Sequence, residues 1–104
     1  MQIRLSGHGA YYHTYHIVWI PKYRRRIFKG EVKEYIAARV RQIEIYHPDV
    51  EVEQHSIQVD HVHVVMVIPP KYAVSQIVGQ VKANLSRQVR GQFPWVRKLY
   101  WGGE

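Results

Sequence analysis

Apolar residues recur along this chain with two different periods, one typical of helices and one typical of strands. Residues 31–47 and 74–92 carry apolar side chains three or four positions apart, which predicts two amphipathic helices. The apolar stripes consist of Val32, Ile36, Val40 and Ile43 in the first helix and Val74, Ile77, Val78, Val81, Leu85 and Val89 in the second. Pro48 ends the first helix and residues 91–94 end the second, because glycine and proline do not continue a helix.

Shorter stretches rich in aromatic and β-branched residues predict the strands. Residues 11–20 have apolar side chains on both faces, which is typical of an interior strand. Residues 50–59 and 61–68 are separated only by Asp60, and two strands this close in sequence most simply form a hairpin. Residues 97–101 resemble the start of a last strand, which stays incomplete before the chain ends.

The order β-α-β-β-α-β predicts an α+β fold of the ferredoxin-like type, an antiparallel sheet with both helices on one face. The 104 residues are enough for a single domain over 1–104 with a single core. Residues 1–10 are short, polar and contain glycine, so we expect a flexible N-terminal arm or a brief lead-in.

The charge balance favours an anionic partner. Lys and Arg number 15 against 8 Asp and Glu, for a net charge of +7, which suits nucleic acid. The absence of cysteine excludes disulfides, thiolate metal sites and cysteine nucleophiles. No apolar run approaches the roughly 20 residues that span a membrane, and residues 1–10 lack the apolar core of a secretory signal. We therefore expect a cytoplasmic protein with no membrane partner.

His61 and His63 are the most informative residues of the chain. Strand side chains alternate between faces, so both imidazoles are predicted to project from one face while Val62 points into the core. Two neutral imidazoles suit one divalent ion, and Mg²⁺ or Mn²⁺ held there keeps open positions for phosphate oxygens. The same pair can equally be two half-exposed histidines with no ligand role.

The sequence does not identify a third metal ligand. Asp60 and Gln58 are close to His61, but strand alternation sends both to the opposite face unless the strand bulges. His16 lies on the predicted central strand and is a candidate neighbour of the site. Eight tyrosines are available as nucleophiles for phosphotyrosine chemistry, and local spacing distinguishes none of them.

A dense basic segment follows the first predicted strand, and the polar side of the second helix adds further cations. Guanidinium groups suit phosphate oxygens, and an aromatic ring can stack on an unpaired base. The alternative is a set of solvated charges that keep the protein soluble. The candidate DNA-binding residues are Lys22, Tyr23, Arg24, Arg25 and Arg26 in the loop and Lys82, Arg87 and Arg90 on the helix.

Four segments of the chain match, in order, the pattern of one known family. Residues 15–25 read YHIVWIPKYRR, 60–64 read DHVHV, 69–76 read PPKYAVSQ and 99–103 read LYWGG. In this order they resemble four parts of the small HUH transposases. These parts are the opening strand with its basic loop, the histidine strand, the lead into the second helix and the start of the last strand. The small HUH transposases are the single-tyrosine enzymes of bacterial and archaeal insertion sequences, and the resemblance covers roughly residues 11–104.

The resemblance implies a homodimeric, metal-dependent transposase that cuts and rejoins single-stranded DNA and binds hairpin DNA near the ends of its element. It implies that His61 and His63 hold Mg²⁺ or Mn²⁺ on the scissile phosphate. The nucleophilic tyrosine of the family, and a glutamine that completes the metal shell, lie on a helix that would follow Glu104. The nucleophile is therefore unknown in this sequence. We expect a catalytically incomplete chain, which is a C-terminally truncated or decayed copy, a fragment, or half of a split product.

Two other functions fit the same residues. One is a non-catalytic module on the ferredoxin-like scaffold that binds single-stranded nucleic acid, although the aromatic pattern of RNA-binding domains is absent. The other is an interaction protein that dimerises through its open sheet edge and has no affinity for DNA. Replacing His61 and His63 with alanine separates the first two functions, because only a metal site would lose Mn²⁺ affinity.

Overall fold

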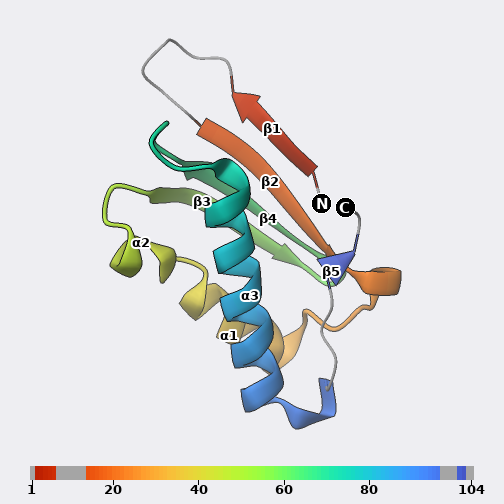
Figure 1. Ribbon diagram of the computed structural model, residues 1–104. Helices are drawn as coiled ribbons and strands as arrows, with labels where there is room; N and C mark the ends of the chain where they lie inside the picture. Colours follow the sequence, from red (N-terminus) through yellow and green to blue (C-terminus); the bar gives the residue numbers. More distant parts are fainter. Residues whose placement is uncertain (1, 7–13, 97–100, 103–104) are drawn as a thin grey trace.

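The computed structural model describes residues 2–6, 14–96 and 101–102. Helices pack against an antiparallel sheet, and α3 crosses in front of the strands (Figure 1). The elements are β1 (Gln2–Ser6), β2 (Thr14–Pro21), η1 (Lys22–Arg24), α1 (Gly30–Arg39), α2 (Ile43–Tyr46), β3 (Glu51–Gln58), β4 (His61–Val67), α3 (Val74–Gln92), η2 (Pro94–Val96) and β5 (Trp101–Gly102). None of the helices in the described residues combines the length and the apolar composition of a membrane-spanning segment.

The strands follow the order β1-β2-β4-β3, and β5 also pairs with β2. One edge of β2 is shared, because β1 pairs with residues 14–18 and β5 with Ile20 and Pro21. The other edge of β2 pairs with β4, so β2 is the interior strand that the sequence predicts. Leaving β1 aside, the order β5-β2-β4-β3 is the ferredoxin-like order, and the predicted α+β fold is confirmed.

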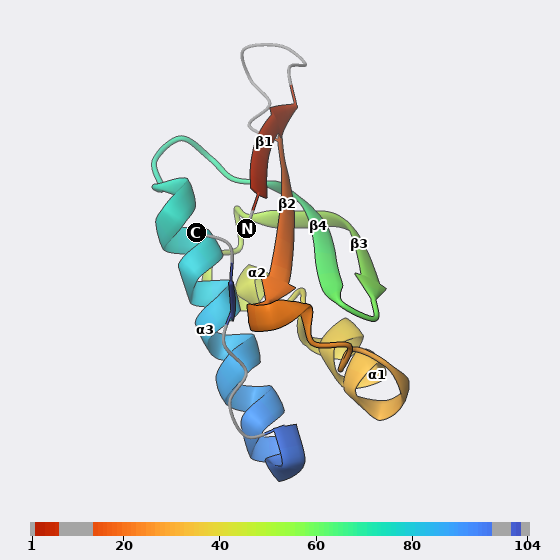
Figure 2. The same cartoon turned by 90° about the vertical axis from the view of Figure 1, so that its right-hand side faces the viewer.

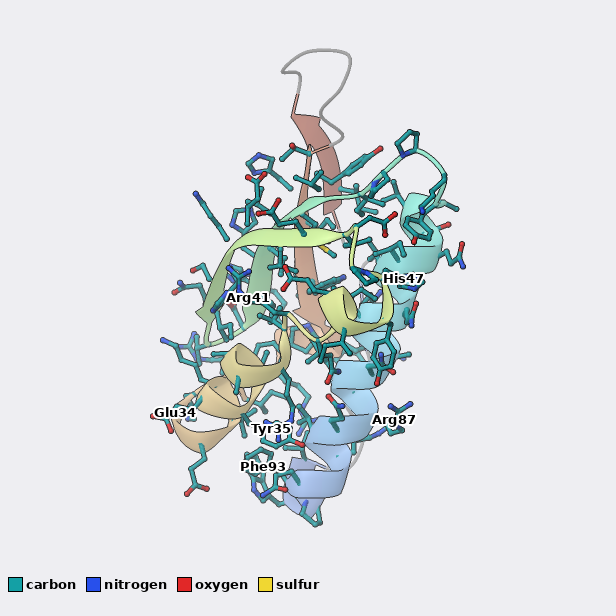
Figure 3. The ribbon with its side chains drawn as sticks, turned by 90° about the vertical axis from the view of Figure 1, so that its left-hand side faces the viewer. Glu34, Tyr35, Arg41, His47, Arg87 and Phe93 are labelled. Carbon is teal, nitrogen blue, oxygen red and sulfur yellow. The ribbon has the colours of Figure 1, made fainter. Side chains whose placement is uncertain are left out.

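The core lies between one face of the sheet and the helices, and Figure 2 shows α3 alongside that face. The predicted apolar stripe of α3 is buried from Ile77 to Val89, and Val74 is partly buried. Tyr35 of α1 packs edge-on against Phe93, with ring centroids 5.3 Å apart, which joins α1 to the end of α3 (Figure 3). In the described residues, this layer of helices leaves the opposite face of the sheet uncovered.

The N-terminal segment differs from its prediction. Residues 2–6 form β1, with a register from Gln2 opposite Val18 to Ser6 opposite Thr14, and not a flexible arm. The hydrogen bonds of β1 go to a strand further along the chain, so a local sequence pattern carries little sign of them. The rest of the predicted arm and the start of the predicted first strand, 7–13, lie outside the described residues, as do 97–100 of the last one.

The predicted helix over 31–47 is two helices. Near the break, the amides of residues 42, 44 and 45 donate to carbonyl oxygens three positions earlier, at 3.0 Å, which tightens the turn. Val40 and Ile43 stay buried on either side of the break, so the apolar stripe continues through it. The apolar stripe therefore predicted the buried positions correctly but gave no sign of the break between α1 and α2.

Candidate functional site

His61 and His63 lie on the face of the sheet that turns away from the helices. Val62, Val64 and Met66 between and beyond them are fully buried, whereas both histidines are partly exposed, with 33% exposure for the His61 side chain. The burial pattern of β4 therefore agrees with the predicted alternation. The two imidazoles share one face, one pleat apart.

His16 brings a third imidazole to this face. The His16 and His63 rings are stacked, with centroids 5.8 Å apart and an interplanar angle of 28°. The contact arises because β2 and β4 are neighbours, with His63 opposite Val18 and His16 opposite Val65. The sequence-based suggestion that His16 lies near the pair is correct.

The environment of His63 favours the neutral imidazole. Burial lowers the pKa of His63 below its ordinary value of 6.5, and the nearby His16 and His61 lower the pKa further because their positive charges would repel its own. A neutral imidazole has a lone pair that can bind a metal ion or accept a hydrogen bond. His63 is therefore in a ligand-competent form at neutral pH.

Asp60 directly contacts the face of the sheet that carries His16, His61 and His63, which we call the histidine face. Its Oδ1 lies 2.9 Å from His61 Nδ1, and its Oδ2 accepts a hydrogen bond of 3.1 Å from Arg24 Nη2. These bonds, that of His61 first and that of Arg24 second, lower the pKa of Asp60 below 3.8, so the carboxylate is ionised at neutral pH. The prediction that alternation sends Asp60 away from the pair is wrong, because Asp60 lies in the turn between β3 and β4.

Gln58 also lies closer to the pair than predicted. The hairpin places Gln58 directly opposite His61 and Ser56 opposite His63, and paired residues of neighbouring strands share a face. The Gln58 Nε2 donates a hydrogen bond of 2.8 Å to Ser56 Oγ. Counting three residues back along one strand gave the wrong face because the chain reverses between the two residues.

The donor set fits part of the shell of a divalent ion. Within the described residues, no group of three or more His, Asp and Glu side chains is arranged to hold a metal ion. Two imidazoles on an accessible face nevertheless offer two nitrogen donors, and oxygens of water or of a phosphate group could fill the remaining positions around an ion bound there. The stacked ring of His16 lies against His63 and forms no further member of such a group.

The basic loop is fixed beside His61. Tyr23 and Arg24 adopt left-handed backbone conformations, with φ of 63° and 49°, and the Tyr23 side chain is 86% exposed. Three contacts hold this segment: the Arg24 bond to Asp60, the Arg25 Nη1 bond to the Val96 carbonyl at 3.4 Å, and the Phe28 amide bond to the Val59 carbonyl at 3.0 Å. The sequence predicted a basic loop but not its attachment to the histidine strand, because no local pattern marks a contact across 36 residues.

The structure does not bring the cations of α3 to this face. Lys82, Arg87 and Arg90 belong to a helix in the layer on the other side of the sheet. Arg87, labelled in Figure 3, is exposed and donates a hydrogen bond of 3.1 Å to Asn84 Oδ1, while Lys82 and Arg90 are partly buried. The predicted DNA-binding residues therefore form two separate groups.

Comparisons with known proteins point to one family. The family model described as "Transposase IS200 like" matches residues 10–104. The transposase for insertion sequence element IS200 of Salmonella typhimurium is 34% identical over 87 residues, which are 84% of this chain and 57% of that protein. The ISDra2 transposase TnpA of Deinococcus radiodurans is 30% identical over 99 residues, or 94% of this chain and 70% of that protein.

A solved structure supports the fold. A crystal structure from Deinococcus radiodurans R1, assigned as a transposase, matches 98% of this chain and 76% of its own, with a TM-score of 0.78 and 24% identity. The chain spans only about 57% of the length of the Salmonella relative.

Proposed function

This chain belongs to the IS200-like transposases, and on that premise we propose that it serves HUH-type, metal-dependent cleavage and rejoining of single-stranded DNA. The observation that carries the proposal is the position of His61 and His63 on one accessible face, beside a basic loop that Asp60 ties to His61. Metal, phosphate and an unpaired base can be held together there. The homodimer that the family resemblance implies is part of the proposal.

His61 and His63 would hold the ion, either Mg²⁺ or Mn²⁺. A divalent ion held there would polarise a phosphate oxygen and would offset the charge that develops during cleavage. The chain contributes a neutral His63, held so by burial and by its two histidine neighbours, and a His61 whose Nδ1 is engaged by Asp60. Both imidazoles are thus prepared as ligands by the protein itself.

The loop residues would bind the DNA strand next to this ion. Lys22, Arg24 and Arg26 carry exposed cationic side chains that suit phosphate oxygens, and the exposed Tyr23 ring can stack on an unpaired base. Arg25 completes the basic loop. Lys82, Arg87 and Arg90 lie in the other layer, so we assign them to a different part of the DNA, the duplex of a hairpin.

Mn²⁺ binding tests the metal site. We expect isothermal titration calorimetry to detect binding to the wild-type chain and none to the His61→Ala/His63→Ala double variant. His55→Ala is the matched control, because His55 is an exposed histidine of the neighbouring strand β3 and does not belong to the histidine pair His61 and His63. Equal Mn²⁺ affinity of the wild type and the double variant would contradict the proposal.

A non-catalytic module for single-stranded nucleic acid is the second candidate. It is favoured by the lack of a group of three His, Asp and Glu ligands among the described residues. It predicts that the double histidine variant binds single-stranded DNA as the wild type does, with or without Mn²⁺. A dependence of DNA affinity on both Mn²⁺ and the two histidines would exclude it.

A further inference from the structure

The Asp60 carboxylate joins two parts of the candidate site that are far apart in sequence. One oxygen contacts His61 on β4, and the other accepts the hydrogen bond from Arg24 of the basic loop. The Asp60 side chain is only 20% exposed, so the contacts are partly shielded from competing water. Both oxygens are therefore used, each by a different partner.

We propose that Asp60 is a positioning residue that holds His61 with its proton on Nδ1 and its lone pair on Nε2, the nitrogen left for a metal ion. A neutral imidazole has one protonated and one unprotonated nitrogen. An ionised carboxylate can only accept, so at 2.9 Å it selects the form in which Nδ1 donates. The role of the Nε2 lone pair rests on the proposed function, whereas the selection of the tautomer does not.

The backbone around Asp60 is held in place from two sides. The last residue pair of the hairpin, Gln58 opposite His61, fixes the two-residue turn that contains Asp60. The preceding residue, Val59, accepts a hydrogen bond of 3.0 Å from the Phe28 amide, which comes from the segment after the basic loop. The carboxylate is thus placed by the fold rather than by the contact with His61 alone.

The ion pair between Asp60 and Arg24 also affects the conformation of the basic loop. Arg24 reaches Asp60 from a loop whose left-handed backbone at Tyr23 and Arg24 is unfavourable for residues other than glycine. The ion pair helps to hold that conformation, yet it uses the oxygen that His61 does not use. Loss of Arg24 should therefore loosen the loop and leave the His61 tautomer unchanged.

The tautomer is measured on the metal-free protein by long-range ¹H–¹⁵N NMR, at a pH where His61 is neutral. We expect the wild type to show a protonated Nδ1 and Asp60→Ala to shift towards the Nε2–H form. Asp60→Asn, whose amide oxygen still accepts, should retain much of the Nδ1–H form, and Arg24→Gln should retain it fully. An unchanged His61 tautomer in Asp60→Ala overturns the proposal.

Mn²⁺ affinity is the second readout. Loss of a hydrogen-bond partner of a ligating histidine typically costs about 10- to 100-fold in metal affinity. We expect a loss in that range for Asp60→Ala, a smaller one for Asp60→Asn, and none for Asp49→Ala. Asp49 is the matched control, because it is also an ion-paired aspartate, but it pairs with Lys71 beyond the other end of β4.

The two readouts separate the two proposals. If the wild type has a fixed Nδ1–H tautomer that depends on Asp60 but binds no Mn²⁺, the positioning role stands and the metal function is wrong. If the wild type binds Mn²⁺ and Asp60→Ala binds it equally well, the positioning role is wrong and the metal function stands. Circular dichroism confirms that each variant is folded before either measurement.

Discussion

Tyr23 combines two features that rarely occur together in one surface residue. Its backbone is left-handed, with φ of 63° and ψ of 18°, and its large ring is 86% exposed. A left-handed conformation costs a residue with a side chain roughly 1–2 kcal/mol, and only glycine avoids the cost. The ring lies 5.3 Å from Lys22 Nζ, and at 86% exposure such a contact contributes little to stability. The role that we propose for the ring, as a platform for an unpaired base, would account for its exposure.

Replacing Tyr23 with glycine should therefore change stability and binding in opposite directions. We expect Tyr23→Gly to raise the free energy of unfolding by about 1 kcal/mol, because glycine removes the strain and the exposed ring contributes little packing. The affinity for single-stranded DNA should fall. Urea denaturation and fluorescence anisotropy measure the two effects.

Tyr46→Gly is the control for that change. Tyr46 is also an exposed tyrosine, but it lies in the helix α2, where glycine should destabilise the fold by about 0.5–1 kcal/mol. A drop in stability for Tyr23→Gly similar to that of Tyr46→Gly would show that the left-handed conformation carries no strain. Unchanged DNA affinity would remove the role of the ring.

At the scale of single elements, the sequence predicted the helices, strands and hairpin that depend on local period and short connections. It missed the pairing with a distant strand and the geometry of the hairpin turn. α3 was predicted with its observed bounds, because its apolar stripe runs unbroken and residues 91–94 stop it. β1 was missed because its partner in the sheet is the distant β2. The positions of Asp60 and Gln58 were wrong for a related reason: alternation along one strand does not extend across a hairpin turn.

The two loops at the far end of β4 are joined by one carboxylate. Asp49, before β3, accepts a hydrogen bond of 2.8 Å from the Tyr72 hydroxyl and forms an ion pair of 2.7 Å with Lys71, before α3. The hydrogen bond from Lys71, together with that from Tyr72, lowers the pKa of Asp49 below its ordinary value of 3.8. The stabilisation by this carboxylate is therefore fully present above pH 3.8 and is lost as the pH falls through the lowered pKa.

Asp49→Asn should reproduce that loss at neutral pH. We expect the variant to be less stable than the wild type at pH 7, and the difference to shrink as the pH falls below 3.8, where the wild-type carboxylate becomes protonated. Urea denaturation at a series of pH values measures it. Glu53→Gln, an exposed carboxylate of β3, is the control. A stability difference that is constant over the whole pH range would exclude ionisation of Asp49 as its cause.

At the scale of the whole molecule, the cationic side chains form two separate groups. The basic loop lies next to the turn between β3 and β4, where Arg24 and Asp60 attach it to His61, and Arg25 bonds to the Val96 carbonyl. The cations of α3 belong to the layer of helices on the face opposite the histidines. A single strand that follows the histidine face would contact the loop and not α3. A structured DNA such as a hairpin is large enough to reach the other layer as well. The net charge of +7 therefore does not act as one uniform surface.

Two double variants test this division. We expect Lys22→Ala/Arg26→Ala to weaken binding of an unpaired oligonucleotide and to reduce the slope of log K against log salt by about 0.7 for each phosphate that is no longer neutralised. Arg87→Ala/Arg90→Ala should leave that slope unchanged and should reduce it only for a hairpin, by about 0.9 per phosphate. Each pair removes two positive charges, so the variants control for net charge. If both variants weaken binding of the unpaired oligonucleotide equally, the strand does not follow the histidine face. If the affinity does not depend on salt, binding has no electrostatic basis.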